Sequence, residues 1–397
     1  MTQSHITFLP DDRSADVGEG ESLLDAAIAA DVPLAGVCGG RAICQRCWVV
    51  VTDGEVVAPP EARGPDGEIL ACLARAVGDV TIRVPESSRI EGEEILTGLE
   101  RPGELPAAED RVAHGLPRAS ELFVSSPLAF ALPLDLPRPT LLDPVSDLGR
   151  LERELQRERN IRHLAVPLDV LRAAPGVLRG ADWAVTAVLA RSPGGYELLD
   201  IRPGTDATRA FGLAVDIGTT TVVVHLVDLG SGATLGAAAA LNRQVAYGDD
   251  VITRIIRAGE PGGLEQLRGA VVGELNVLVG RLAHTHDVSG NEIVTAVISG
   301  NTAMVHLFLG LAPDEIRRSP YVPVATLPPA QHAGALGLRI HPRATVTVMP
   351  GVASYVGGDI VADVLAAGMD TTGELSMLID AGTNGETVIG NRDFLIC

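Results

Sequence analysis

The stretch CGGRAICQRCWVVV, residues 38–51, decides how the N-terminal part of the chain folds. It places Cys38, Cys44 and Cys47 with five and two residues between them, and Cys72 follows after 24 further residues. The glycines beside Cys38 tolerate positive φ, so the backbone there can wrap closely around a bound group. The apolar, β-branched run after Cys47 predicts a strand. The expected structure is a metal-binding loop that leads into a strand.

The spacing of the four cysteines predicts a [2Fe-2S] cluster with Cys38, Cys44, Cys47 and Cys72 as its ligands. Cysteine thiolates hold such clusters, and plant-type ferredoxins use a similar close spacing of the first three ligands. The main alternative is a zinc site, but zinc ribbons have paired Cys-x2-Cys knuckles and the sequence lacks the second pair. Cys397 stands far from this set and is expected to be an ordinary thiol.

The composition limits the classes of function. All 31 basic residues are arginine, against 51 acidic ones, which gives a formal net charge of −20. Without lysine there is no Walker-type phosphate loop and no Schiff-base chemistry. The acidic balance argues against nucleic-acid binding. No signal peptide or membrane span is recognisable, and five cysteines in such a chain suggest metal or redox chemistry, so a cytoplasmic protein is expected.

The periodicity of apolar residues divides the chain into four parts. Residues 1–88 are expected to form a β-grasp ferredoxin domain, with strands at Ile6–Phe8 and Trp48–Val51 around a helix. Residues 89–125 have the composition of a linker, and residues 126–208 that of a small α/β middle domain. Residues 209–397 predict three strands and then alternating helices and strands, ending with a β-hairpin. The fold class is therefore multidomain α+β and α/β.

Two segments of the last part resemble each other: DIGTTT, residues 216–221, and DAGTNGE, residues 380–386. In each, an aspartate ends a strand and Gly-Thr makes a tight turn whose N–H groups suit phosphate oxygens. The aspartates suit hydrated Mg²⁺. Two such hairpins separated by β-α units have the layout of the actin, Hsp70 and sugar kinase superfamily. The expected nucleotide-binding residues are Asp216, Gly218, Thr219, Thr220, Asp380, Gly382, Thr383 and Asn384, and no catalytic residue is assigned.

Together, the cysteine loop and the paired hairpins resemble one family, the reductive activators of corrinoid proteins. The resemblance covers essentially the whole chain and includes the segments GLAVDIGTTTV, NRQVAYGDDVITRI, SGNTAMVHLFLG and YVGGDI. It implies a [2Fe-2S] domain, a linker, a middle domain and an actin-like ATP-binding domain. The implied activity is ATP-dependent reduction of corrinoid Co(II) to Co(I). The implied partners are the corrinoid protein of a methyltransferase system and an upstream electron donor.

The sequence departs from the family at two points. Ala381 stands where the family usually has isoleucine, and family members continue well past residue 397. The actin-like domain is therefore expected to be incomplete, with its first lobe and only the start of the second, and to bind Mg-ATP weakly when alone. Three other readings stay open: a ferredoxin-type subunit for a different acceptor, an actin-like regulatory scaffold, and a sugar or acetate kinase.

Overall fold

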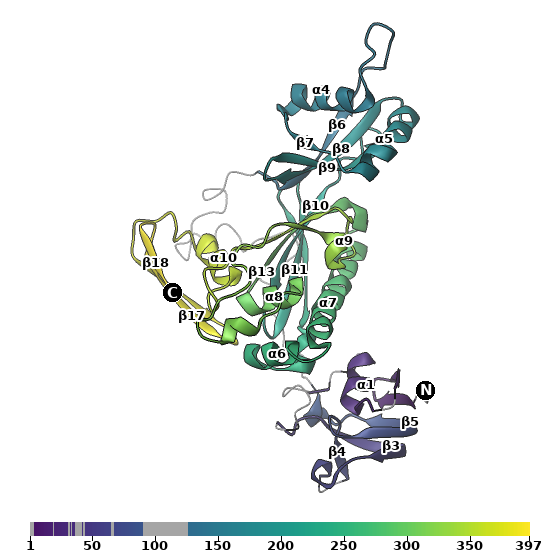
Figure 1. Cartoon of the computed structure of the whole chain (residues 1–397), viewed down its shortest axis with the longest axis vertical. Coiled ribbons are helices and arrows are strands. Elements are labelled where there is room, and N and C mark those ends of the chain that lie inside the picture. Colours follow the sequence, from purple (N-terminus) through teal and green to yellow (C-terminus); the bar gives the residue numbers. More distant parts are fainter. Residues whose placement is uncertain are drawn as a thin grey trace.

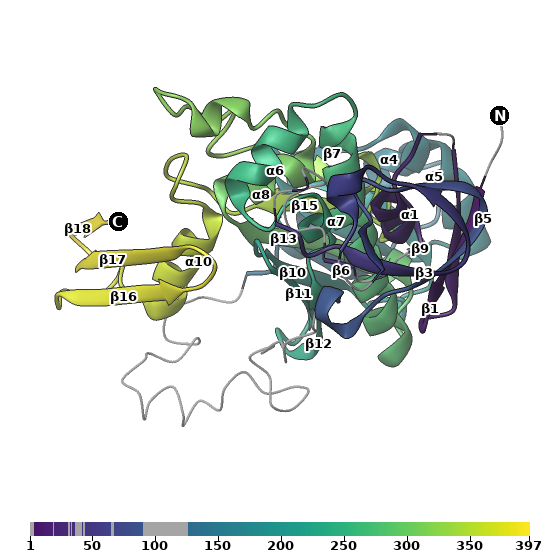
Figure 2. The same ribbon diagram turned by 90° about the horizontal axis from the view of Figure 1, so that it is seen from below.

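The computed structural model describes residues 4–18, 20–30, 32, 34–35, 42, 44–64, 67–89 and 126–397. The strands of this part of the chain form four sheets. Figure 1 shows the N-terminal unit at one end of the molecule and the unit that follows residue 126 at the other, with the largest sheet between them. Figure 2 shows the C-terminal hairpin projecting away from that sheet.

The N-terminal unit is a five-stranded sheet of order β2-β1-β5-β3-β4 with α1 packed against it. β1 and β5 pair in parallel, and the other neighbours are antiparallel. Ser22 and Asp25 form a capping box that fixes the start of α1. The elements are β1 (Ser4–Leu9), β2 (Arg13–Val17), α1 (Leu23–Ala29), β3 (Trp48–Val57), η1 (Pro60–Ala62), β4 (Glu68–Leu70), β5 (Arg75–Arg83) and η2 (Glu86–Ser88).

The strand after the cysteine loop is longer than the sequence suggests. The sequence predicts that Asp53-Gly54 ends this strand, and that prediction is wrong. β3 continues to Val57 and stays paired with β5, with register shifts on both sides of Asp53. Gly54 has φ +89°, and a Cβ on it would lie 2.4 Å from the carbonyl oxygen of Asp79. The glycine therefore makes a bulge inside the strand and does not end it.

The unit after residue 126 is a sheet of order β6-β8-β9-β7 with two helices packed on it. The helical spacing of Leu148, Leu151 and Leu155 predicts a helix over residues 146–157, and Ser-Pro-Gly-Gly at residues 192–195 predicts a hairpin. Both elements are present. α5 was not predicted because Pro175 lies inside it, yet the helix buries one apolar face. The elements are β6 (Ala129–Asp135), α4 (Asp147–Arg159), β7 (Leu164–Ala165), α5 (Leu168–Gly180), β8 (Ala184–Ser192) and β9 (Gly195–Pro203).

The largest sheet has the order β12-β11-β10-β13-β15-β14, with β10, β13 and β15 parallel. The predicted series of three strands followed by helices and strands is present, with α6, α9 and β14 in addition. Its elements are β10 (Phe211–Ile217), β11 (Thr221–Asp228), β12 (Thr234–Leu241), η3 (Arg243–Tyr247), α6 (Val251–Ala258), α7 (Gly263–Thr285), η4 (Gly290–Glu292), β13 (Ile293–Gly300), α8 (Thr302–Leu309), η5 (Asp314–Arg317), β14 (Gln331–His332), α9 (Ala333–Leu336), β15 (Thr345–Val348) and α10 (Gly358–Ala367).

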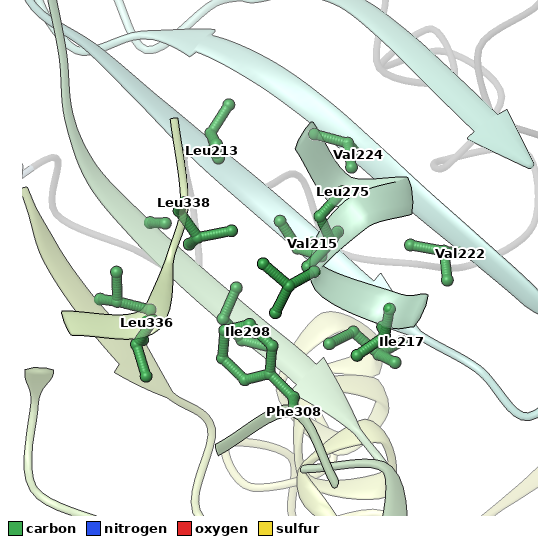
Figure 3. Close-up of a cluster of buried hydrophobic side chains, with 14 of the residues drawn as sticks. Leu213, Val215, Ile217, Val222, Val224, Leu275, Ile298, Phe308, Leu336 and Leu338 are labelled. Carbon is green, nitrogen blue, oxygen red and sulfur yellow. The ribbon is translucent and has the colours of Figure 1, made fainter. Parts of the chain in front are cut away.

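The core of this lobe lies between one face of the large sheet and the helices that cover it. Along β10, Leu213, Val215 and Ile217 alternate with more exposed residues, because successive side chains of a strand point to opposite faces. Leu275 of α7 and Phe308 of α8 pack onto the buried face, as Figure 3 shows. The strand ends that carry the first phosphate hairpin therefore rest on a rigid base.

The C-terminal hairpin is a separate three-stranded sheet of β16 (Ser376–Ala381), β17 (Gly385–Asn391) and β18 (Phe394–Ile396). A small cluster, which includes Val388 and residues of α10, joins it to the lobe. Alternate side chains along β16 and just before it are exposed, among them Leu375, Met377 and Ile379. One face of this hairpin is therefore apolar and open to solvent.

Candidate cluster and nucleotide sites

The predicted cluster ligands lie on the loop before β3 and the turn after β4. Cys38 is outside the described residues. Ala42 and Gln45 have φ of 58° and 53°, in the left-handed region, and each stands two residues before a cysteine. Because such residues reverse the local direction of the chain, the loop curls on the approach to Cys44 and again before Cys47. Cys44 is half-buried.

Cys47 and Cys72 lie together beneath this loop. Both are buried, and the N–H of Ala71 donates a hydrogen bond of 2.9 Å to the carbonyl oxygen of Cys47. A hydrogen bond from Cys72 lowers the pKa of the Cys47 thiol to about 7, against the opposing effect of burial. Thiolates are the form in which cysteine binds metals. This pair therefore has the chemistry that a cluster requires.

The described residues fit a cluster only in part. The loop curls at two left-handed positions, two sulfurs are adjacent, and a third cysteine is near them in sequence. Within the described part of the chain, however, no three Cys, His, Asp or Glu side chains converge on one metal position. Four thiolates are needed to hold a [2Fe-2S] cluster, so the assignment of Cys38, Cys44, Cys47 and Cys72 stays a prediction.

The two predicted phosphate hairpins meet in space although the threonines that touch are 163 positions apart in the sequence. The hydroxyl groups of Thr220 and Thr383 form a hydrogen bond of 2.7 Å. Asp216, at the end of β10, and Asp380, at the end of β16, line one cavity of about 480 Å³. The turn of the second hairpin is closed by Gly382, whose N–H donates to the carbonyl oxygen of Asn384 at 3.2 Å.

The first hairpin is held by two asparagines that the sequence analysis did not assign to the site. Asn242, which is fully buried, donates from Nδ2 to the carbonyl oxygen of Gly218 at 2.8 Å. Its backbone N–H donates to the carbonyl oxygen of Thr220 at 2.8 Å. Asn301, at the start of α8, donates from Nδ2 to Oγ1 of Thr219 at 3.1 Å. Each asparagine directly follows a strand, and this position at a strand end is the sequence feature that could have identified both as site residues.

Two further carboxylate side chains, which belong to α10 and are not among the predicted site residues, line the same cavity. Asp359 and Asp363 line it together with Asp216 and Asp380. Gly357 and Gly358 allow this approach, since a Cβ on Gly357 would lie 2.5 Å from the Cα of Asn301. The segment YVGGDI is one of the family-like segments of the sequence, but only the fold shows that its aspartate lines the same cavity as the hairpin aspartates.

The carboxylates in this cavity repel one another. Partial desolvation in the cavity, followed by the charges of Asp359 and Asp380, raises the pKa of Asp216 to about 6, although the residue stays accessible to solvent. Burial, followed by the charges of the other three, raises the pKa of Asp363 to about 6. Burial is also the largest cause of the raised pKa of Asp359. A cation would relieve this repulsion, so the cavity has the electrostatics of a site for a metal ion with a polyanion.

Three descriptions of known protein regions match the chain in sequence order. A 2Fe-2S iron-sulfur cluster binding domain matches residues 6–77, a RACo linker region matches residues 119–208, and a RACo middle region matches residues 211–372. The predicted ferredoxin domain and the predicted multidomain fold class are confirmed. Among the described residues, no helix is both long and apolar enough to cross a membrane.

Individual relatives agree with these regions. The corrinoid activation enzyme RamQ of Eubacterium limosum is 29% identical over 398 residues, which cover 95% of this chain and 58% of RamQ. A mitochondrial adrenodoxin homolog of Saccharomyces cerevisiae is 32% identical over 88 residues, 21% of this chain and 46% of that protein. A solved structure of a reductive activator for corrinoid, iron-sulfur protein is 38% identical with a TM-score of 0.68, over 99% of this chain and 62% of that one. The chain thus spans about three fifths of its long relatives.

Proposed function

As its motifs predict, this chain is similar to the reductive activators of corrinoid proteins, and we propose that it passes single electrons to a corrinoid protein. In the proposed reaction, one electron from a reduced [2Fe-2S] cluster converts Co(II) of the corrinoid to Co(I), and an upstream donor replaces that electron. The observation that carries the proposal is the presence in one chain of a ferredoxin-type domain and of two phosphate hairpins in contact.

The proposed roles follow from the placement of the side chains. Cys38, Cys44, Cys47 and Cys72 would hold the cluster, which supplies one-electron chemistry when bound. Burial of Cys47 and Cys72 keeps water away from those two sulfurs. At the other site, the turns at Gly218 and Gly382 would present N–H groups to phosphate oxygens. Asp216, with Asp380 and the α10 carboxylates, would hold hydrated Mg²⁺.

ATP has an energetic purpose in this proposal. Plant-type [2Fe-2S] clusters have potentials near about −400 mV, and corrinoid Co(I) requires a very low potential. Coupling free energies between two sites are about 1–3 kcal/mol, which correspond to roughly 40–130 mV for one electron. Binding of Mg-ATP at the hairpins would therefore shift the electron transfer by changing how the chain holds its partner, without taking part in the electron step itself.

The proposal is tested by mixing the reduced protein anaerobically with a Co(II) corrinoid protein and following the corrinoid absorbance, with and without Mg-ATP. The expected result is conversion to the Co(I) spectrum, faster or more complete with Mg-ATP. Cys44→Ser should abolish the conversion, because it removes a predicted ligand. Cys397→Ser is the matched control and should leave it unchanged. A corrinoid spectrum that stays unchanged both with and without Mg-ATP would contradict the proposal and favour the scaffold alternative.

A further inference from the structure

The short helix η3 begins at the side chain that holds the first phosphate hairpin. Asn242 precedes η3, and its Oδ1 accepts a hydrogen bond of 3.1 Å from the N–H of Gln244. The same side chain donates to the carbonyl oxygen of Gly218. One buried amide group therefore caps η3 and also fixes the hairpin turn, so a shift of the turn displaces the start of η3.

A buried polar network ties the rest of η3 to the lobe. Gln244, fully buried, donates from Nε2 to the carbonyl oxygen of Leu267 in α7 at 2.9 Å. The guanidinium of Arg254, also fully buried, donates to Oε1 of Gln244 at 3.4 Å and to the carbonyl oxygen of Gly248 at 2.8 Å. Breaking a buried hydrogen bond leaves one partner unsatisfied and is therefore costly, so η3 moves with this network.

Arg254 is also incompletely satisfied. Within the described residues, its Nη2 has no hydrogen-bond partner. Burial lowers the pKa of Arg254 to about 10, which still leaves the side chain charged at neutral pH. A buried cation with an unpaired donor is not fully fixed by its hydrogen bonds, so this end of the network is its least constrained part.

The outer face of η3 lines a cavity whose opposite side is formed by the ferredoxin domain. Val245, Ala246 and Tyr247 line one wall of this cavity of about 430 Å³. Ile28 of α1 and residues 32 and 34 line the other, and Figure 1 shows α1 next to this end of the lobe. Burial raises the pKa of the Tyr247 hydroxyl, with a smaller contribution in the same direction from Asp25 of α1. The two domains thus face each other here.

The residues of the ferredoxin domain that line this cavity are close in sequence to the cluster loop. Leu34 stands four residues before Cys38 and forms a β-bridge with Arg89, the last described residue before the segment that leads to the second unit. Ala35 donates from its N–H to the carbonyl oxygen of Ser88 at 2.9 Å. A displacement of this wall would therefore reach both the cluster loop and the exit of the domain.

We propose that η3 is the docking surface for the ferredoxin domain of the same chain, and that it couples the first phosphate hairpin to the position of that domain. The inference rests on the proposed function, since it requires nucleotide at the hairpin. The cavity, which Arg243, Gln266 and Glu274 also line, removes dispersion contacts from between the two walls, so the domain is held less tightly than by a fully packed interface. Nucleotide shifts the hairpin and Asn242, η3 follows, and the balance between docked and released ferredoxin domain changes.

The test is hydrogen exchange of the intact, cluster-loaded chain with and without saturating Mg-ATP. Three peptides are compared: the hairpin at residues 216–221, η3, and α1. Coupling free energies of about 1–3 kcal/mol correspond to changes of about fivefold or more, so Mg-ATP should change exchange in all three peptides by at least that factor. Protection of the hairpin with unchanged exchange in α1 would overturn the coupling alone. Unchanged exchange at the hairpin would overturn the nucleotide site and the coupling together.

Variants separate the docking surface from the nucleotide site. Ala246→Glu adds a bulky carboxylate beside Glu274 in this cavity without touching the hairpin, so Mg-ATP should still protect residues 216–221 while α1 no longer responds. Ile28→Glu, on the opposite wall, should have the same effect, and an unchanged cluster spectrum shows that the ferredoxin domain is folded. Ala283→Glu, a half-buried alanine of α7 outside this cavity, is the control. An α1 response that persists in both cavity variants would contradict the proposal.

Discussion

The two phosphate hairpins share a sequence pattern but have very different support. The first is backed by the largest hydrophobic core of the chain, and Asn242 and Asn301 hold its turn. The second joins the lobe through a small cluster, and most of its apolar side chains face solvent. A motif of the type Asp-x-Gly-Thr therefore specifies the local turn only. The elements behind the turn determine whether it is rigid.

A matched pair of substitutions should expose this difference most strongly. Ile217 is fully buried beside Asp216, and Ile379 is 66% exposed beside Asp380. Ile217→Ala should lower the free energy of unfolding of the lobe by about 2–5 kcal/mol, because it leaves a cavity in the core. Ile379→Ala should change it by about 0.5 kcal/mol or less. Guanidinium denaturation followed by circular dichroism measures both, and similar losses would contradict the contrast.

The asparagines give a second, smaller contrast. Asn242→Ala leaves the carbonyl oxygen of Gly218 without its donor and should cost about 1–3 kcal/mol. Asn391 donates from Nδ2 to the carbonyl oxygen of Gly373 at 3.2 Å, in an exposed position on the second hairpin. Asn391→Ala should cost about 0.5 kcal/mol or less, since water can replace that bond. If the two variants unfold at the same denaturant concentration, the first hairpin is not held as described.

The carboxylate of Asp216 predicts a pH dependence. Its pKa is raised from 3.8 to about 6 in the folded chain, so the folded state holds the proton more tightly than the unfolded state does. The contribution of Asp216 to stability should therefore be present below pH 4 and should be lost as the pH rises to about 6. Asp216→Asn should remove this loss of stability with rising pH, so it should stabilise the chain at pH 7 but not at pH 4. Thermal unfolding at both pH values checks the sign.

The sequence was most informative where local pattern and fold agree. Runs of apolar and β-branched residues located β10, β11 and β13, and the long apolar face located α7. α6 was not predicted, although Asp250 caps it by accepting a hydrogen bond of 2.8 Å from the N–H of Thr253. The equally short α8 was predicted, so length alone does not explain the difference.

The site was less predictable than the fold. The pairing of Asp216 with Asp380 followed from a repeated motif, whereas Asp359 and Asp363 belong to a helix whose approach depends on the contact of Gly357 with Asn301. Such a contact joins segments that are far apart in sequence, and no local pattern encodes it. The role of Asn242 was hidden for the same reason, because its partners become visible only when β10, β11 and η3 are placed together.

Metal analysis of the anaerobically purified chain shows whether the loop before β3 holds a [2Fe-2S] cluster. We expect about two iron atoms and two acid-labile sulfides per chain. Cys44→Ser should bleach the visible spectrum, and Cys397→Ser should not. One zinc atom per chain with no sulfide would contradict the cluster assignment and restore the zinc alternative.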